Sequence, residues 1–155
     1  MAAVIKQPKL NSSRSTVLIV DDQTTSRLIL ENIARTIDDN LEVKCFDNAY
    51  DALLEAESSP PDLILTDYKM PNIDGVEFIE RLKNNIRCSD IPIVIITALD
   101  DKEALYKALE AGATDFLVKP VDHYECKVRC HNLLTMQRQK LIIKDYASSL
   151  EVKIN

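Results

Sequence analysis

The chain has 155 residues, of which 25 are Asp or Glu and 19 are Lys or Arg, so its formal net charge is −6. This length suits one domain with a real core, and an apolar fraction of 46% is that of an ordinary globular protein. The acidic balance argues against a nucleic-acid-binding surface. With only two glycines, Gly75 and Gly112, the chain has neither a dinucleotide-binding glycine turn nor a P-loop.

The sequence also argues against membrane insertion and secretion. No apolar run approaches the roughly 18 residues that span a bilayer. Near the N-terminus, apolar residues are scattered among Lys6, Pro8 and Lys9, unlike the apolar core of a signal peptide. We therefore expect a cytoplasmic protein without a membrane partner, in which residues 1–14 form a flexible tail.

Four cysteines do not predict a disulfide framework in a chain that can build a core of this size. Cys126 and Cys130 stand beside His131, but this spacing matches no standard zinc site and no second ligand pair follows. Four residues apart, the two thiols share one face of a helix. We expect both to act there as small apolar side chains.

Short apolar segments alternate with helical patterns along the chain. Strands are predicted at residues 16–20, 41–46, 62–66, 91–97 and 114–118. Helices are predicted at residues 23–37, after an N-cap at Asn48, at 75–82, at 100–110 before Gly112, and from Asp122 onward. This alternation predicts an α/β fold: a doubly wound, five-stranded parallel sheet of flavodoxin-like order 2-1-3-4-5.

Polar side chains follow the predicted strands at the edge where such sheets bind ligands. Asp21 and Asp22 come after the first strand, Asp67 follows the third, Thr97 ends the fourth and Lys119 ends the fifth. Neighbouring carboxylates repel by about 4 kcal/mol per pair at roughly 4 Å and an effective dielectric near 20. A cation with all-oxygen ligands, above all Mg²⁺, would relieve that repulsion.

Four sequence features together resemble the receiver domain of bacterial two-component response regulators. They are Asp21-Asp22, the run Asp67-Tyr-Lys-Met-Pro-Asn-Ile-Asp-Gly75, Thr97-Ala98 and Lys119-Pro120. The resemblance covers about residues 15–135. It implies that a partner histidine kinase or phosphotransfer protein supplies a phosphoryl group to this segment.

The resemblance also assigns a role to each site residue. Asp67 would accept the phosphoryl group, with Lys119 and Thr97 contacting its oxygens. The Mg²⁺ ion would be held by Asp22 directly, by Asp21 through water, by Asp67 and by the backbone carbonyl of Lys69. The family further implies a cis Lys119–Pro120 bond that aims the lysine.

The signalling step that the resemblance implies is a two-state shift of Thr97 and Phe116. In the family, the phosphate draws the strand-4 hydroxyl inward and an aromatic residue of strand 5 rotates behind it. Phe116 lacks the phenol of the commoner Tyr, and ordinary core packing is an alternative reading of this residue. Gly75 also fits a plain turn before a helix.

The last helix has no Gly or Pro from Asp122 to Asn155. Met136, Ile143 and Leu150 are seven apart, Ala147 and Ile154 repeat that spacing with an offset of four, and Lys140 is a polar exception. This heptad pattern favours a parallel dimeric coiled coil over residues 136–155, which would lead toward a missing output domain. The pattern around residues 128–134 and the following helix resembles receivers that precede cyclic di-GMP enzymes, often phosphodiesterases of the HD-GYP kind. No catalytic residue for that chemistry occurs here, so we expect a switch that only phosphorylates and dephosphorylates itself.

Two other functions are weighed against the receiver. A haloacid dehalogenase-type phosphatase would share the sheet and Mg²⁺, but it needs an Asp two residues after the nucleophile, where this chain has Lys69. A flavodoxin would use Thr24, Thr25 and Ser26 as a phosphate loop, beside which Asp21 and Asp22 would repel the flavin phosphate.

Overall fold

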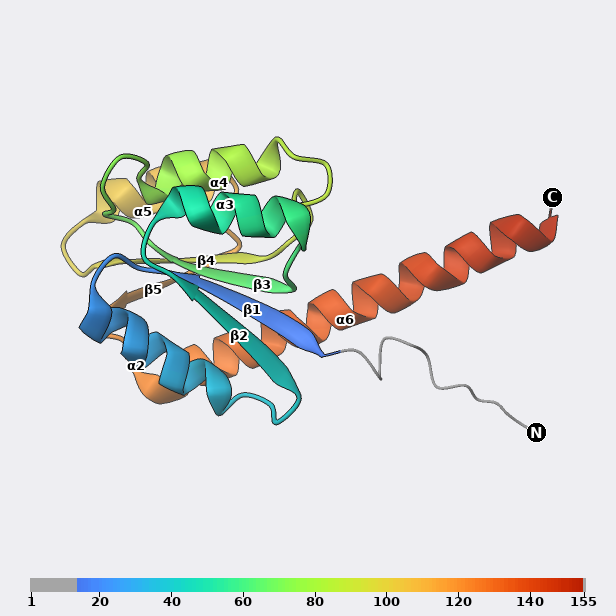
Figure 1. The fold of residues 1–155 in the computed structure, drawn as a ribbon, viewed down its shortest axis with the longest axis horizontal. Coiled ribbons are helices and arrows are strands. Elements are labelled where there is room, and N and C mark those ends of the chain that lie inside the picture. Colours follow the sequence, from blue (N-terminus) through green and yellow to red (C-terminus); the bar gives the residue numbers. More distant parts are fainter. Residues whose placement is uncertain (1–13, 155) are drawn as a thin grey trace.

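The computed structural model describes residues 14–154, with side chains up to Leu150. Ten elements alternate strictly between strand and helix (Figure 1). The strands are β1 (Ser15–Val20), β2 (Leu41–Phe46), β3 (Leu63–Asp67), β4 (Ile93–Ala98) and β5 (Asp115–Lys119). The helices are α2 (Thr24–Arg35), α3 (Ala49–Ser58), α4 (Gly75–Lys83), α5 (Lys102–Ala111) and α6 (His123–Ile154).

The five strands form one parallel sheet in the order β2-β1-β3-β4-β5, as predicted. Helices α2 and α6 cover one face, and α3, α4 and α5 cover the other (Figure 1). Each face buries its own apolar cluster, and strands β1, β3 and β4 contribute side chains to both clusters. Burial on both faces explains why these strands are continuous apolar runs in the sequence.

Polar caps set where several helices begin. The Asn48 side chain accepts a hydrogen bond from the Asp51 N–H at 2.9 Å, which confirms the predicted cap of α3. Asp101 accepts from the Ala104 N–H, so α5 begins at Lys102, later than the sequence pattern indicated. Strand β4 likewise begins at Ile93 and not at 91, because Pro92 has no N–H to donate to the sheet.

Helix α6 crosses the whole domain and continues beyond it (Figure 1). His123 shares a cavity with Asp21 beyond the carboxyl end of β1, whereas Arg138 contacts Ser15 at the amino end of that strand. Cys126 and Cys130 are fully buried against the sheet, as predicted for small apolar side chains. Residues 142–150 are all exposed.

Two further observations concern predictions made from the sequence. Of the tail predicted at residues 1–14, only Arg14 is described, and its guanidinium donates to the Leu41 carbonyl at 2.8 Å; the other thirteen residues lie outside the described part. Within residues 14–154, no helix is long and apolar enough to cross a membrane. All four cysteines of this part are thiols without a disulfide.

Candidate functional site

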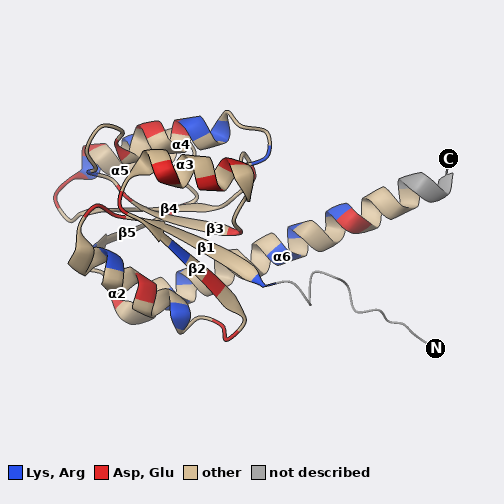
Figure 2. Cartoon of the chain, viewed as in Figure 1, with Lys and Arg blue, Asp and Glu red and all other residues tan. Residues whose placement is uncertain are grey.

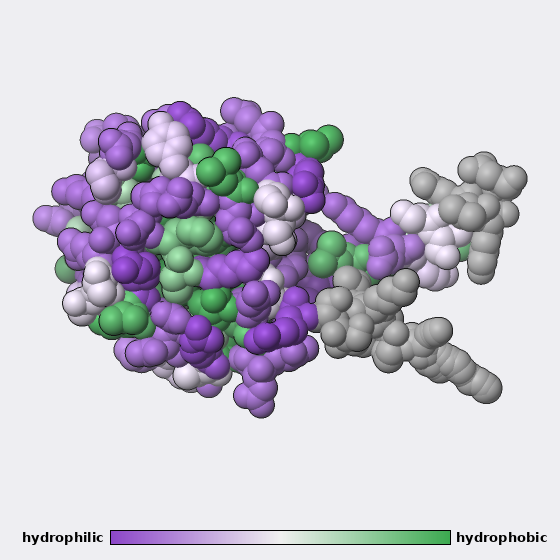
Figure 3. Space-filling view, viewed as in Figure 1, coloured by the Kyte–Doolittle hydropathy of each residue, from purple (hydrophilic) through white to green (hydrophobic). Residues whose placement is uncertain are grey.

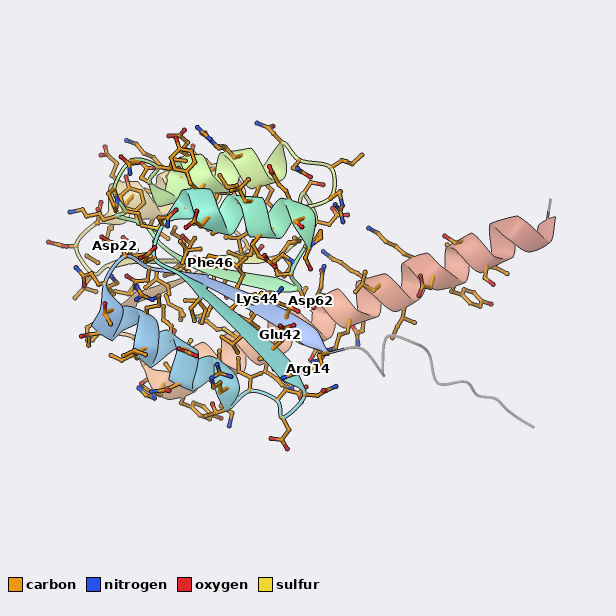
Figure 4. The ribbon with its side chains drawn as sticks, viewed as in Figure 1. Arg14, Asp22, Glu42, Lys44, Phe46 and Asp62 are labelled. Atoms are coloured by element: carbon orange, nitrogen blue, oxygen red, sulfur yellow. The ribbon has the colours of Figure 1, made fainter. Side chains whose placement is uncertain are left out.

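The carboxyl ends of β1 and β3 bring three carboxylates together. Asp21, Asp22 and Asp67 each offer an oxygen, and these atoms lie within 4.8 Å of one another. Acidic segments are visible in the loops at this end of the sheet, to the left in Figure 2. Figure 4 labels Asp22 at that end and Arg14 and Asp62 at the opposite end. The convergence predicted for these three residues is therefore present in the fold.

Asp21 is the buried member of the cluster. Its side chain is fully inaccessible, and its Oδ1 atom accepts from the Gln23 N–H at 2.9 Å. Its Oδ2 atom is buried and has no hydrogen-bond partner among the residues that the structure describes. Burial raises the pKa of Asp21, and the nearby Asp67 carboxylate raises it further. An orphaned oxygen in an all-oxygen cluster fits a hard divalent cation.

Asp67 is the last residue of β3 and is 5% exposed. Its Oδ1 atom lies 3.1 Å from the Lys119 Nζ atom and accepts from the Tyr68 N–H at 2.8 Å. The Lys119–Pro120 bond is cis, as expected. The lysine therefore holds one oxygen of Asp67, and Oδ2 receives no hydrogen bond from the described residues.

Thr97 lies beside this pair in the buried part of β4. Its Oγ1 atom is buried and lacks a hydrogen-bond partner within residues 14–154. A cavity of about 70 Å³ is lined by Thr97 together with Asp67 and Lys119. Phe116 does not line that cavity. Its half-buried ring packs against the cluster on the α5 side, with the Arg129 guanidinium 6.0 Å from the ring centroid.

An open cavity of about 580 Å³ gives access to the carboxylates from solvent. Asp22, Asp67, Lys69 and Lys119 line it, and the Lys69 carbonyl stays a predicted ligand.

Gly75 supports this site by close packing, which its reading as a plain turn residue missed. Its φ is not positive. A Cβ atom there would lie 2.9 Å from the Asp67 carbonyl oxygen and 2.7 Å from Ile95 Cδ1. A side chain at this position would therefore push against the strand that carries Asp67.

Comparisons with known proteins agree with this geometry. The family described as the response regulator receiver domain matches residues 17–130. The chain belongs to this family. Receivers of this kind work in two-component signalling, with histidine kinases or phosphotransfer proteins as their partners.

Three relatives show how far the likeness extends. The cyclic di-GMP phosphodiesterase response regulator RpfG of Xanthomonas campestris pv. campestris is 42% identical over 89% of this chain and 36% of its own length. Response regulator PleD of Caulobacter vibrioides is 36% identical over 83% of this chain and 27% of its own length. This receiver thus spans about a third of the length of these curated relatives. A candidate response regulator from Chloroflexus aurantiacus, solved by crystallography, superposes with a TM-score of 0.74 and 32% identity, covering 79% of this chain and 99% of that one.

Several groups that shape the receiver site were missed by sequence reasoning. The backbone N–H groups of Gln23 and Tyr68 orient the two buried carboxylates. The Arg27 guanidinium donates to the Asp21 carbonyl at 2.8 Å, which fixes the loop that carries the acidic pair. The spacing of Asp21 and Gln23 is that of an Asx turn, and this signal could have predicted the first contact.

Proposed function

We propose that Asp67 is the phosphoacceptor of this receiver and that Mg²⁺ binds beside it. The observation that carries the proposal is the ion pair of Asp67 Oδ1 with Lys119 Nζ at 3.1 Å, within a cluster of three carboxylates. Because Oδ1 is already engaged, Oδ2 is the proposed nucleophile. It attacks the phosphorus atom of a phosphohistidine, a P–O bond forms, the P–N bond breaks and the imidazole of the donor leaves.

The roles of the surrounding residues follow from their placement. Asp21, Asp22, Asp67 and the Lys69 carbonyl would hold the ion, which supplies charge neutralisation for the phosphoryl oxygens when bound. Lys119 either leaves Asp67 Oδ1 or stays near it, and in both cases it pairs with a phosphoryl oxygen. The unpartnered Thr97 hydroxyl donates to another, and this contact is the proposed origin of the conformational response with Phe116.

A small phosphodonor such as acetyl phosphate tests the assignment. With Mg²⁺ present, we expect one phosphoryl group per chain, mapped by mass spectrometry to Asp67 and absent from Asp67→Asn. Asp100→Asn, which removes an exposed carboxylate from a neighbouring loop, is the control and should label like the parent. Phosphate on another residue, or labelling retained by Asp67→Asn, would contradict the proposal.

The proposal also predicts that this receiver differs in activity from a phosphatase of the haloacid dehalogenase type. Position 69, where that chemistry needs an Asp, is an exposed lysine at the cavity rim. We therefore expect no steady turnover of a small phosphate ester, only slow loss of the group from Asp67. Sustained release of inorganic phosphate in large excess over the chain would favour the phosphatase.

The chain is further proposed to act as a cytoplasmic homodimer, with residues 15–135 as the receiver and 136–155 as a helical extension. The apolar residues Met136, Ile143 and Leu150 are 51%, 67% and 41% exposed, which supports pairing through α6; the side chain of Ile154, part of the same heptad pattern, lies outside the described residues. Sedimentation equilibrium should show a dimer that Ile143→Asp disrupts. A monomer at every accessible concentration would overturn this part.

The likeness to RpfG supports a cyclic di-GMP phosphodiesterase as the output that this receiver controls. The test is a cyclic di-GMP hydrolysis assay of the full gene product with and without phosphorylation. Activity that is absent, or identical in the parent and Asp67→Asn, would refute this assignment.

A further inference from the structure

The exposed face of α6 has the spacing of a two-stranded seam. Met136, Ile143 and Leu150 repeat every seven residues, and Lys140 and Ala147 fall four residues after the first two of them. In heptad terms the three apolar residues occupy d positions, and Lys140 and Ala147 occupy a positions. A single lysine at an a position is a feature of coiled coils with a defined register and a small number of strands.

This seam separates from the face by which α6 holds its own domain only beyond Lys140, because Met136 and Lys140 still line a cavity against the receiver. Gln137 is 8% exposed, and one heptad later the Lys144 Nζ atom lies 3.0 Å from the Asp90 carboxylate. Because both residues are one position beyond the d residues Met136 and Ile143, they lie to one side of the seam. A second helix can therefore pack along residues 142–150, which are all exposed, without displacing the receiver. Apolar side chains are visible at the root of the projecting helix in Figure 3.

Lys140 is placed in a basic corner between α6 and the loop that precedes β4. A cavity of about 150 Å³ is lined by Lys140 together with Lys83 and Asp90. Lys83 Nζ donates to the carbonyl oxygens of Ser89 and Ile91, and burial lowers the pKa of Lys83. Three ammonium groups, counting Lys144, thus surround one carboxylate, and the hydrogen bond from Lys144 lowers the pKa of Asp90.

We propose that two copies of this chain pair in parallel along this seam and that Asp90 of each receiver permits the pairing by neutralising Lys140. This inference rests on the proposed dimer. It adds Asp90, a residue outside α6, as a group that controls the pairing. In this pair the Lys140 stem packs in the seam, and its ammonium group stays at the cavity that Asp90 also lines. Without that carboxylate, closing the seam would bring two uncompensated basic corners together.

A second copy is the occupant that this face fits best. The heptad spacing matches only a helix of the same spacing, and the basic corner offers no complement to another cationic surface. In a parallel pair the two Lys140 residues lie opposite each other. The local carboxylate is then the nearest group that compensates them, so its loss should weaken the dimer in addition to removing the Asp90–Lys144 pair within each chain.

A double-mutant cycle in the full chain tests this role of Asp90. Sedimentation equilibrium gives the dimer dissociation constant of the parent, Asp90→Asn, Lys140→Leu and the double variant. We expect Asp90→Asn to raise the constant by about threefold to tenfold, and more at low salt. Lys140→Leu should lower the constant, and Asp90→Asn should then lose most of its effect. Asp100→Asn, at the other end of the sheet, is the matched control and should dimerise like the parent.

The outcomes distinguish the two levels of the inference. A parent chain that stays monomeric overturns the proposed dimer and this inference with it. A parent chain that dimerises, with Asp90→Asn weakening the dimer equally in the parent and in Lys140→Leu, leaves the dimer intact and refutes the neutralisation of Lys140 by Asp90. If Asp90→Asn acts only through the loss of the Asp90–Lys144 pair, it weakens the dimer equally in the parent and in Lys140→Leu. The cycle therefore isolates the contribution of Lys140.

Discussion

Asp21 lowers the stability of the fold while it contributes a carboxylate to the candidate site. Its carboxylate is buried, one oxygen is unpartnered among the described residues, and Asp67 lies nearby. Asp21→Asn should therefore raise the free energy of unfolding by roughly 1–2 kcal/mol in the absence of Mg²⁺. Urea denaturation checks this, and the Mg²⁺-dependent increase in stability of the parent should disappear in the variant. A parent and variant of equal stability without Mg²⁺ would argue against stored repulsion.

The pH dependence of Asp21 has a definite sign. Its pKa is raised in the folded state, mainly by burial. Between the unfolded pKa of about 3.9 and the higher folded value, the folded chain binds more protons than the unfolded chain, so stability falls as pH rises through this window. The difference in urea midpoint between the parent and Asp21→Asn should show this slope across that window, because carboxylates such as Asp38 titrate in both chains.

Thr97 poses a similar test for the proposed switch. Because its buried hydroxyl has no partner in the described residues, Thr97→Val should leave the free energy of unfolding unchanged or slightly higher. The phosphorylation-dependent change in hydrogen exchange of β5 should nevertheless be lost. A variant that keeps this change while Asp67 is phosphorylated would show that the hydroxyl is not the trigger.

At the scale of elements, Gly75 joins the start of α4 to the end of β3. An added Cβ would meet backbone atoms of Asp67 and Tyr68 at 2.9 and 3.0 Å, and backbone cannot move aside as a flexible side chain can. Gly75→Ala should lower the free energy of unfolding by about 1–3 kcal/mol. Chemical denaturation checks this, with Val76→Ala at the next, half-buried position as the control. An equal loss of stability in Gly75→Ala and Val76→Ala would indicate a general effect on the packing of α4 and not the close approach at Gly75.

The type and order of every element could be predicted from the sequence, and so could the convergence of Asp21, Asp22 and Asp67, because apolar runs and strand-end polar residues are local patterns. The exact first and last residues of the elements could be predicted less well from the sequence. The sequence indicated that Asp67 follows a strand, whereas it is the last residue of β3 and its neighbour Tyr68 still donates to Ile96. The close approach at Gly75 was hidden because it depends on Ile95, a residue of another strand.

On the scale of the whole molecule, α6 is held to the domain by contacts between distant parts of the chain. The Arg138 guanidinium donates to the Asp38 carboxylate at 2.9 Å and to the Ser15 hydroxyl at 3.0 Å. Asp38 and Arg138 are 100 residues apart, and no sequence pattern links them. Such pairs depend on how the formed helices, strands and loops pack against one another, so they could not be predicted from one sequence.

Arg138→Gln should loosen the projecting half of α6 without unfolding the receiver. A backbone hydrogen bond from Asn40 and the hydrogen bond from Arg138 lower the pKa of Asp38, so the stability they contribute is present above about pH 3.9 and is lost as pH falls below it. Hydrogen exchange should be faster in residues 138–150 of the variant at neutral pH. Arg35→Gln, whose parent arginine pairs with Glu31 of the same helix α2, is the control.

Arg138 lies near the midpoint of α6. About 22 Å of helix separates His123 from Arg138, and about 24 Å separates Arg138 from Ile154, at 1.5 Å per residue. Because Cys126, Cys130 and Leu134 are buried against the sheet, the first half of α6 is packed into the receiver along its length. Any tilt of that packed half would thus be carried by the continuous helix into residues 142–150, which are all exposed.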